Sequence, residues 1–279
     1  MQSLHNYHMS CEKVVKMYDK IVDTRVEKRK EIQGIGKDRG DIIAAGLTPL
    51  KVLLDVIEAP VIMISGNGLR EGLFFEKYFQ IHKQPYIVED VLGHSIQNTL
   101  NNYDVNIQHS MHVQKLALAL FDQLQTLHGM DKFERSILAV AAQLHDVGMY
   151  VDYYNHHKHG FYLTLNTKID GLTHRELVMC AFIVGMHRIT DLKQSWREYN
   201  EIIDKKDYEM IKKLALFVRI AEKLDRNEYG IVESITCHVT DKCIEIKVEA
   251  TNTAELEIIA AMQNNKAFEK LFNRKLYIV

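Results

Sequence analysis

Hydrophobic residues recur along most of the chain with the spacing of amphipathic helices, and only short stretches alternate as strands do. Ser10 suits the cap of a helix over about 10–23, and a second long apolar helix follows in "GDIIAAGLTPLKVLLDVIEA". The stretch "PVIMISGNGLREGLFFEKYF" has the pattern of a strand, a glycine turn and a helix. One strand cannot form a sheet, so we expect this segment to be part of a larger α/β unit.

From about residue 88 the pattern becomes wholly helical. Helical periodicity recurs at 91–102, 109–128, 133–147, 174–187 and 207–226. After about 231 the pattern changes again: "IVESITCHVT" and "CIEIKVEAT" predict a hairpin, followed by helical pieces within 253–272 and a final strand "KLYIV". The chain is therefore predicted to be mainly α, with an incomplete α/β segment (1–86), an all-helical domain (87–229) and a small α+β cap (230–279).

Composition excludes several classes of protein. The 279 residues are 47% apolar and 26% charged, as in an ordinary soluble globular protein, and no apolar stretch approaches the length of a membrane span. A net charge of −2 gives no global field for nucleic acid or an anionic membrane. The four cysteines are widely separated and Cys180 lies in an apolar run, which favours free thiols and a cytoplasmic location.

Histidines are concentrated in the helical region, where nine of the fourteen fall between 109 and 187. His145 and Asp146 end the helical run "ILAVAAQLHDVG", in which Gly148 can terminate the helix. His109 lies in the first turn of an apolar helix, and His187 ends "RELVMCAFIVGMHR". Side chains at the ends of several helices can converge on one ion, or on an ion pair bridged by the carboxylate.

Two carboxylates complete this set. Glu222 and Asp225 are three residues apart on one face of the last helix of the domain. Imidazole and carboxylate ligands suit a divalent ion such as manganese, iron or magnesium, with zinc as a further candidate, although a cysteine-rich zinc site is not indicated. The alternative is a polar centre that is satisfied by hydrogen bonds and holds no metal.

The order of these motifs resembles the HD-domain superfamily of metal-dependent phosphohydrolases. The resemblance implies metal ligands at His109, His145 and Asp146, and matches the extra histidines of two-metal members to His187 and to His159 or His156. The superfamily usually has aspartate where this chain has Glu222, so Glu222 binds the ion, binds it more weakly, or leaves Asp225 to substitute.

A larger resemblance covers essentially the whole chain. The stretches "KDRGDIIAAGLTPLKVLLDVI" and "VIMISGNGLREGLFFE" resemble the closing part of the actin-like module of the exopolyphosphatase and guanosine pentaphosphate phosphatase family. That family's HD-like helical domain has, in the same order, "LHDVG", "HKHGFYL", "N-x-x-I-x-G-L" and "HR". The resemblance implies a phosphohydrolase that removes the terminal phosphate of polyphosphate or (p)ppGpp with magnesium support.

The family's "D-x-G-S-N-S" and "G-G-G-S" phosphate loops do not occur in this sequence. We therefore expect the family reaction to need an N-terminal actin-like lobe or a full-length parent, and the chain alone not to hydrolyse polyphosphate by that mechanism. A homodimer is expected. Two alternatives remain: an independent HD-type phosphohydrolase acting on a nucleotide or phosphoester, and a non-catalytic regulatory or dimerisation module.

Four cations are candidates for substrate binding. Arg39 either faces a phosphate cleft or belongs to a helix cap, and Arg70 either contacts phosphate or braces the glycine turn by pairing with Glu71. Lys158 and Arg188 either line a path for a polyanion or are solvated helix ends.

Overall fold

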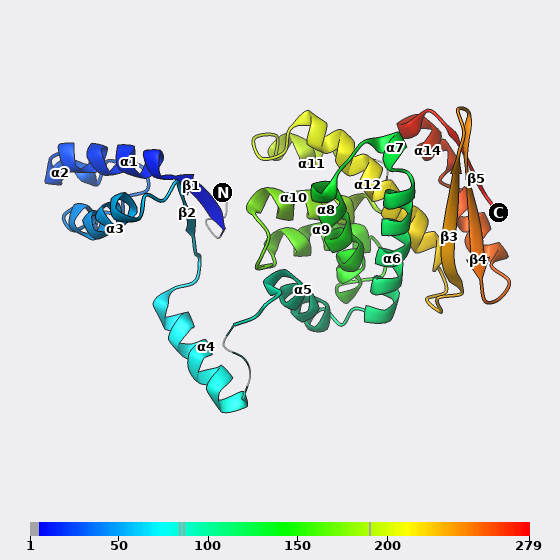
Figure 1. Ribbon diagram of the computed structural model, residues 1–279, viewed down its shortest axis with the longest axis horizontal. Coiled ribbons are helices and arrows are strands. Elements are labelled where there is room, and N and C mark those ends of the chain that lie inside the picture. Colours follow the sequence, from blue (N-terminus) through cyan, green and yellow to red (C-terminus); the bar gives the residue numbers. More distant parts are fainter. Residues whose placement is uncertain (1–5, 84, 86, 190) are drawn as a thin grey trace. The chain divides into compact units, whose positions relative to one another are not determined.

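The computed structural model describes residues 6–83, 85, 87–189 and 191–279, and the chain forms two compact units, 1–86 and 87–279 (Figure 1). Helices account for most of both units, as the sequence pattern predicts. The division of the second unit at residue 229 stays a prediction.

The N-terminal unit combines a two-stranded sheet with helices. Its elements are β1 (Tyr7–Ser10), α1 (Cys11–Asp23), α2 (Val26–Arg29), α3 (Ile43–Ile57), β2 (Val61–Ile64) and α4 (Leu69–His82). β1 pairs antiparallel with β2, so that Tyr7 lies opposite Ile64. The sequence pattern did not predict β1, because the four residues "YHMS" are too short a run to be recognised as a strand. Ser10 caps α1 as predicted, accepting a hydrogen bond from the backbone N–H of Lys13 at 3.4 Å.

The second unit begins with a helical bundle. Its elements are α5 (Val91–Asn102), α6 (Ile107–Gln123), α7 (Gln125–His128), α8 (Lys132–Leu144), the 3-10 helix η1 (Val147–Tyr150), α9 (His156–Asn166), α10 (His174–Met186), α11 (Lys193–Glu198) and α12 (Lys205–Leu224). α10 packs against α8, α9 and α12, and α6 packs against α8 and α12. Periodicity did not predict α9, because the residues that this helix buries are two histidines, a glycine and a threonine.

Reciprocal side-chain caps fix where three of these helices begin. Asp131 accepts a hydrogen bond from the Phe133 N–H at 2.8 Å, and Glu134 accepts one from the Asp131 N–H at 2.9 Å. The same reciprocal arrangement begins α10 at Thr173 and α12 at Asp204. A cap of this kind stabilises a helix by about 1 kcal/mol, so the helices that carry the site residues start at defined positions.

The chain ends in a three-stranded sheet with two short helices. The elements are β3 (Val232–Val239), β4 (Cys243–Ala250), α13 (Glu255–Met262), α14 (Asn265–Phe272) and β5 (Lys275–Ile278). β3 and β4 form the predicted antiparallel hairpin, and β5 joins β4 in parallel. The buried residues of the bundle and of this sheet form one hydrophobic cluster, in which the Phe217 ring of α12 stacks on Phe272 of α14 with centroids 5.6 Å apart. Among the described residues, no helix has both the length and the apolar character needed to cross a bilayer.

Candidate metal centre

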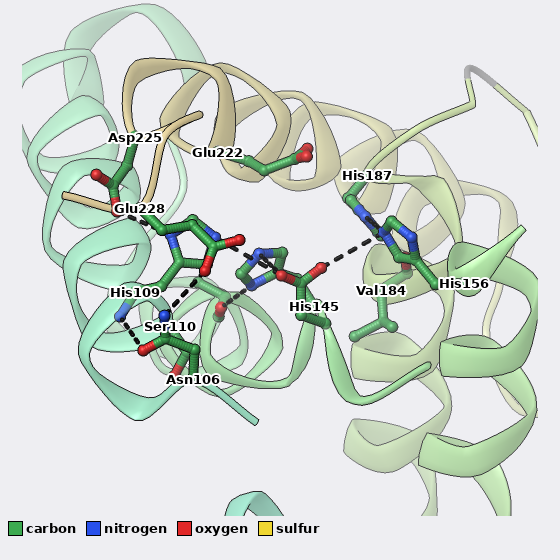
Figure 2. Close-up of polar contacts among 12 residues, drawn as sticks. Asn106, His109, Ser110, His145, His156, Val184, His187, Glu222, Asp225 and Glu228 are labelled. Atoms are coloured by element: carbon green, nitrogen blue, oxygen red, sulfur yellow. Dashed lines mark hydrogen bonds and ion pairs between the residues drawn. The ribbon is translucent and has the colours of Figure 1, made fainter. Parts of the chain in front are cut away.

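Four histidines converge on Asp146 at the centre of the bundle (Figure 2). Two groups of potential metal ligands share this carboxylate: His109, His145 and Asp146 form one, and Asp146, His156 and His187 form the other. Within each group the ligand atoms lie within 4.8 Å of one another. One carboxylate therefore lies between two sets of imidazole nitrogens.

Helix ends bring these side chains together. His109 lies in the first turn of α6, His145 directly follows α8, His156 begins α9 and His187 directly follows α10. Gly148 permits a close approach between η1 and α9, because a Cβ at this position would lie 1.9 Å from the carbonyl oxygen of His156. Only glycine lets η1 pass this close to α9, and this contact places His156 beside Asp146.

The backbone orients three of the four rings. Each donates its Nδ1–H to the carbonyl of the third residue before it, over 2.5–2.9 Å: His145 to Ala142, His156 to Tyr153 and His187 to Val184. Because a carbonyl oxygen only accepts, Nδ1 carries the hydrogen and Nε2 is the atom that faces the centre. Metal-binding histidines are oriented in this way by a hydrogen bond to their other nitrogen.

Asp225 orients the fourth ring. Its Oδ2 lies 2.8 Å from Nδ1 of His109, and its Oδ1 accepts a hydrogen bond from the Gly230 N–H at 2.8 Å. Gly230 has a φ of +63°, a conformation that glycine adopts without strain. Both carboxylate oxygens of Asp225 are thus occupied, and the residue lies behind His109 and outside the two ligand groups. The arrangement corresponds to the carboxylate–histidine pairs found around metal ions.

Charge is unevenly distributed over the rings. Burial disfavours the protonated form of His145, but the Asp146 carboxylate outweighs it and raises the pKa of His145 to about 9. Burial likewise opposes ionisation of Asp146, yet His145 and the other rings hold the pKa of this carboxyl far below its usual range. In the ion-free protein these two residues form a buried ion pair.

The two remaining rings face each other. Nε2 of His156 lies 3.0 Å from Nε2 of His187. Burial lowers the pKa of His156, and it lowers the pKa of His187 to about 3, so both rings are neutral near pH 7. With both hydrogens on Nδ1, two lone pairs point at each other, and a cation between them would remove this repulsion. The donor set therefore fits a divalent ion better than a purely hydrogen-bonded centre.

Glu222 lies beside the two groups. Its Oε1 accepts hydrogen bonds from Arg188 at 2.9 Å and from Lys223 at 3.3 Å. Its Oε2 is buried and has no hydrogen-bond partner in the described part of the chain. Buried polar atoms normally have a partner, so this oxygen is suited to a bound ion or water.

A pocket of about 270 Å³ opens onto this centre. Its lining includes His109 and Asp146 from the ligand groups together with three cations and two further carboxylates: Arg188, Lys223, Arg226, Glu222 and Glu228. Met149, Tyr153 and Gln263 complete the lining. A ligand in this pocket would touch both His109 and Asp146 of the candidate ligand groups and several cations.

The predicted site residues do not all meet here. The ligand groups in the described residues contain His156 and not His159, and Glu222 lies beside them. One feature of the sequence could have favoured His156 over His159. His156 and Gly160 are four residues apart, so they lie on the same face of α9, and this face is buried. Arg188 lines the pocket, whereas Lys158 is exposed on α9.

The other two predicted cations belong to the N-terminal unit. Arg39 and Arg70 are both exposed there. Glu71, expected to brace the glycine turn by pairing with Arg70, accepts a hydrogen bond from the Gly68 N–H at 3.0 Å and so caps α4.

Comparison with known protein families matches residues 91–266 to domain III of the Ppx/GppA phosphatases and residues 1–81 to the Ppx/GppA phosphatase family. The chain belongs to the Ppx/GppA phosphatase family. A guanosine-5'-triphosphate,3'-diphosphate pyrophosphatase of Pseudoalteromonas translucida (strain TAC 125) is 25% identical over 172 residues, which are 60% of this chain and 32% of that relative. The matched part thus spans about a third of the relative's length. All members of both ligand groups lie within domain III of this Ppx/GppA protein.

Proposed function

We propose that domain III is an HD-like, metal-dependent phosphohydrolase in which His109, His145 and Asp146 would hold one divalent ion, and Asp146, His156 and His187 a second. The observation that carries this proposal is the position of Asp146 between two pairs of imidazoles. In His109, His145, His156 and His187, the partner of Nδ1 leaves Nε2 for a ligand. Manganese, iron, magnesium and zinc are the candidate ions, since imidazole and carboxylate ligands suit all of them to different degrees.

The residues around the centre have distinct roles in this proposal. Ions bound there would lower the pKa of a water molecule and polarise a phosphoryl oxygen. The free Oε2 of Glu222 would accept a hydrogen bond from the attacking water and receive its proton. Arg188, Lys223 and Arg226 would bind the phosphates of the substrate, because guanidinium and ammonium groups form charge-assisted hydrogen bonds with phosphate oxygens.

The charge of the pocket supports a role for ions in binding as well as in catalysis. In the lining, Glu222 and Glu228 oppose Arg188, Lys223 and Arg226, while the charge of Asp146 is already paired with His145, so the positive charge of the ion-free pocket is largely compensated. Without ions the lining offers little net attraction for a polyanion. Two divalent ions would make it strongly positive and favour a substrate with several phosphate charges.

The family match favours a second candidate function. Residues 1–81 match the Ppx/GppA phosphatase family separately from domain III, and the Pseudoalteromonas relative is named as a pyrophosphatase of guanosine-5'-triphosphate,3'-diphosphate. In this alternative an N-terminal actin-like lobe removes the terminal phosphate of polyphosphate or (p)ppGpp, and domain III binds the substrate. A homodimer and a cytoplasmic location stay predictions in either case.

Metal content and hydrolysis measured on the same preparation test the proposal. We expect the purified chain to hold close to two divalent ions and to release phosphate from tripolyphosphate. The double variant His145→Ala, Asp146→Ala should lose both ions and more than about 100-fold in rate, because loss of an outer partner alone costs 10–100-fold in affinity or activity. Protein that holds no ion under manganese loading would contradict the proposal, and tripolyphosphate binding by such protein would favour the second candidate.

A further inference from the structure

The pocket above the centre carries an apolar surface that phosphate binding does not use. Met149 and Tyr153 contribute to its lining, and they remain 38% and 57% exposed. Both come from one short segment, η1 and the loop after it, whereas Lys223 and Arg226 come from the end of α12 and the residues after it. The pocket thus combines side chains suited to two different parts of a ligand.

The position of Tyr153 is fixed relative to the centre. Its backbone carbonyl accepts the Nδ1 hydrogen bond of His156 at 2.9 Å, so it is tied directly to a residue of the second ligand group. The guanidinium carbon of Arg188 lies 5.9 Å from the centroid of the Tyr153 ring. The Tyr154 ring meets Tyr153 edge to face, with centroids 5.5 Å apart. The half-exposed Tyr153 ring is therefore held next to both a metal-binding residue and a phosphate-binding cation.

An inorganic phosphate chain has nothing to pack against a phenol ring or a thioether. A nucleobase does, because aromatic side chains bind bases by stacking and methionine makes favourable contacts with aromatic rings. Gln263, which also lines the pocket, is exposed and offers both a donor and an acceptor. Such a group suits the polar edge of a base or the hydroxyls of a sugar.

We propose that Tyr153 and Met149 form a nucleoside subsite and that the ligand of domain III is a nucleoside polyphosphate and not inorganic polyphosphate. The proposal rests on the proposed function only in that the ions would hold the phosphates. Tyr153 is a specificity-determining residue here: its ring would bind the base, and the phosphate groups would lie over the ligand groups and the cations.

GTP and tripolyphosphate form a matched pair of probes, since they share a triphosphate and differ in the nucleoside. Binding of each is measured calorimetrically to the full chain with calcium, and KM and kcat are measured separately with manganese. We expect GTP to bind at least about tenfold more tightly than tripolyphosphate. Tyr153→Ala should weaken GTP binding about tenfold and raise KM for GTP with kcat little changed, whereas tripolyphosphate binding stays within about twofold.

Two variants control the measurement. Tyr153→Trp keeps an aromatic surface and should retain GTP binding, which guards against a Tyr153→Ala protein that is simply misfolded. Tyr162→Ala removes an exposed tyrosine that does not line the pocket, and it should behave as the unmodified chain. Equal affinity for GTP and tripolyphosphate, or equal weakening of both by Tyr153→Ala, would overturn the inference.

Failure of this inference and failure of the proposed function are distinguishable. A chain that holds ions and hydrolyses tripolyphosphate but shows no preference for GTP retains the function and loses the nucleoside subsite. A chain without ions that still binds GTP through Tyr153 keeps the subsite and loses the phosphohydrolase. A chain that binds neither probe refutes both.

Discussion

The Nε2 atoms of His156 and His187 lie 3.0 Å apart, and each ring is held from behind by a backbone carbonyl. Such a close contact between the Nε2 lone pairs of two neutral imidazoles is repulsive, and a cation bound by both nitrogens would remove the repulsion. We therefore predict that His156→Ala or His187→Ala lowers the metal content from about two ions to about one, as measured by elemental analysis after dialysis. His159→Ala is the matched control on the same helix, and we expect it to keep both ions. Loss of an ion in His159→Ala and not in His156→Ala would reverse the assignment.

Asp225 would act through His109 on an ion held by the first ligand group. Asp225→Asn keeps the size of the side chain but removes the charge that supports the His109 ring, so metal affinity of the first ligand group should fall about 10–100-fold. A competition titration with a chromophoric chelator measures this change. Asp241→Asn, in the exposed turn between β3 and β4, should have no effect. An unchanged affinity in Asp225→Asn would show that the His109 ring needs no support.

Metal binding should release a proton. Free His145 has a pKa raised to about 9, so its ring is protonated at pH 7.5, and a ligating imidazole must be neutral. We predict release of about one proton per first ion bound, and an apparent affinity that rises about tenfold per pH unit up to about pH 9. Calorimetry in two buffers with different ionisation enthalpies gives the proton count. Zero release would mean that His145 is neutral before the ion binds.

Gly148 should be intolerant of any side chain. Gly148→Ala places a methyl group against the backbone of His156 and Gly160, so α9 must move away from η1. We expect the free energy of unfolding to fall by about 1–3 kcal/mol and the second ligand group to lose its ion. Thermal denaturation and metal analysis measure the two effects. Gly46→Ala, at a helical glycine with open space around its Cβ position, is the control: it should leave the metal content unchanged and should not lower the free energy of unfolding.

Most of the architecture could be predicted from periodicity. The long helices at His109, His145 and Glu222 have an apolar face, the helix before His187 is apolar on every side, and the positions of all four along the chain were predicted. α9 was not, because its buried face consists of His156, His157, Gly160 and Thr164 and gives no hydrophobic signal. The strand β1 was not predicted either. It has only four residues, and its pairing with β2 is a contact between distant parts of the chain.

The sequence indicated some residues of the candidate site and could not distinguish others. Residue types and spacing were enough to select the His145–Asp146 pair and the flanking helix ends. They could not separate Asp225 from Glu222, because one helical turn puts both near the centre and only the packing of α6 determines which one meets Nδ1 of His109. Nor could they separate His156 from His159, since the choice depends on the contact between Gly148 and α9.

The stacking of Phe217 on Phe272 joins the bundle to the C-terminal sheet through shared buried side chains. Removal of the last fifty or so residues would expose an aromatic surface at the middle of α12, the helix that ends at Glu222 and Asp225. We therefore expect the backbone amides of α12 and β4 to exchange their hydrogens through the same unfolding event, with similar free energies of opening, as measured by native-state hydrogen exchange. Accordingly, we expect the terminal sheet to belong to the same cooperative folding unit as the helices of the candidate metal centre, and proteolytic trimming there to disrupt the centre without removing any of its potential ligands.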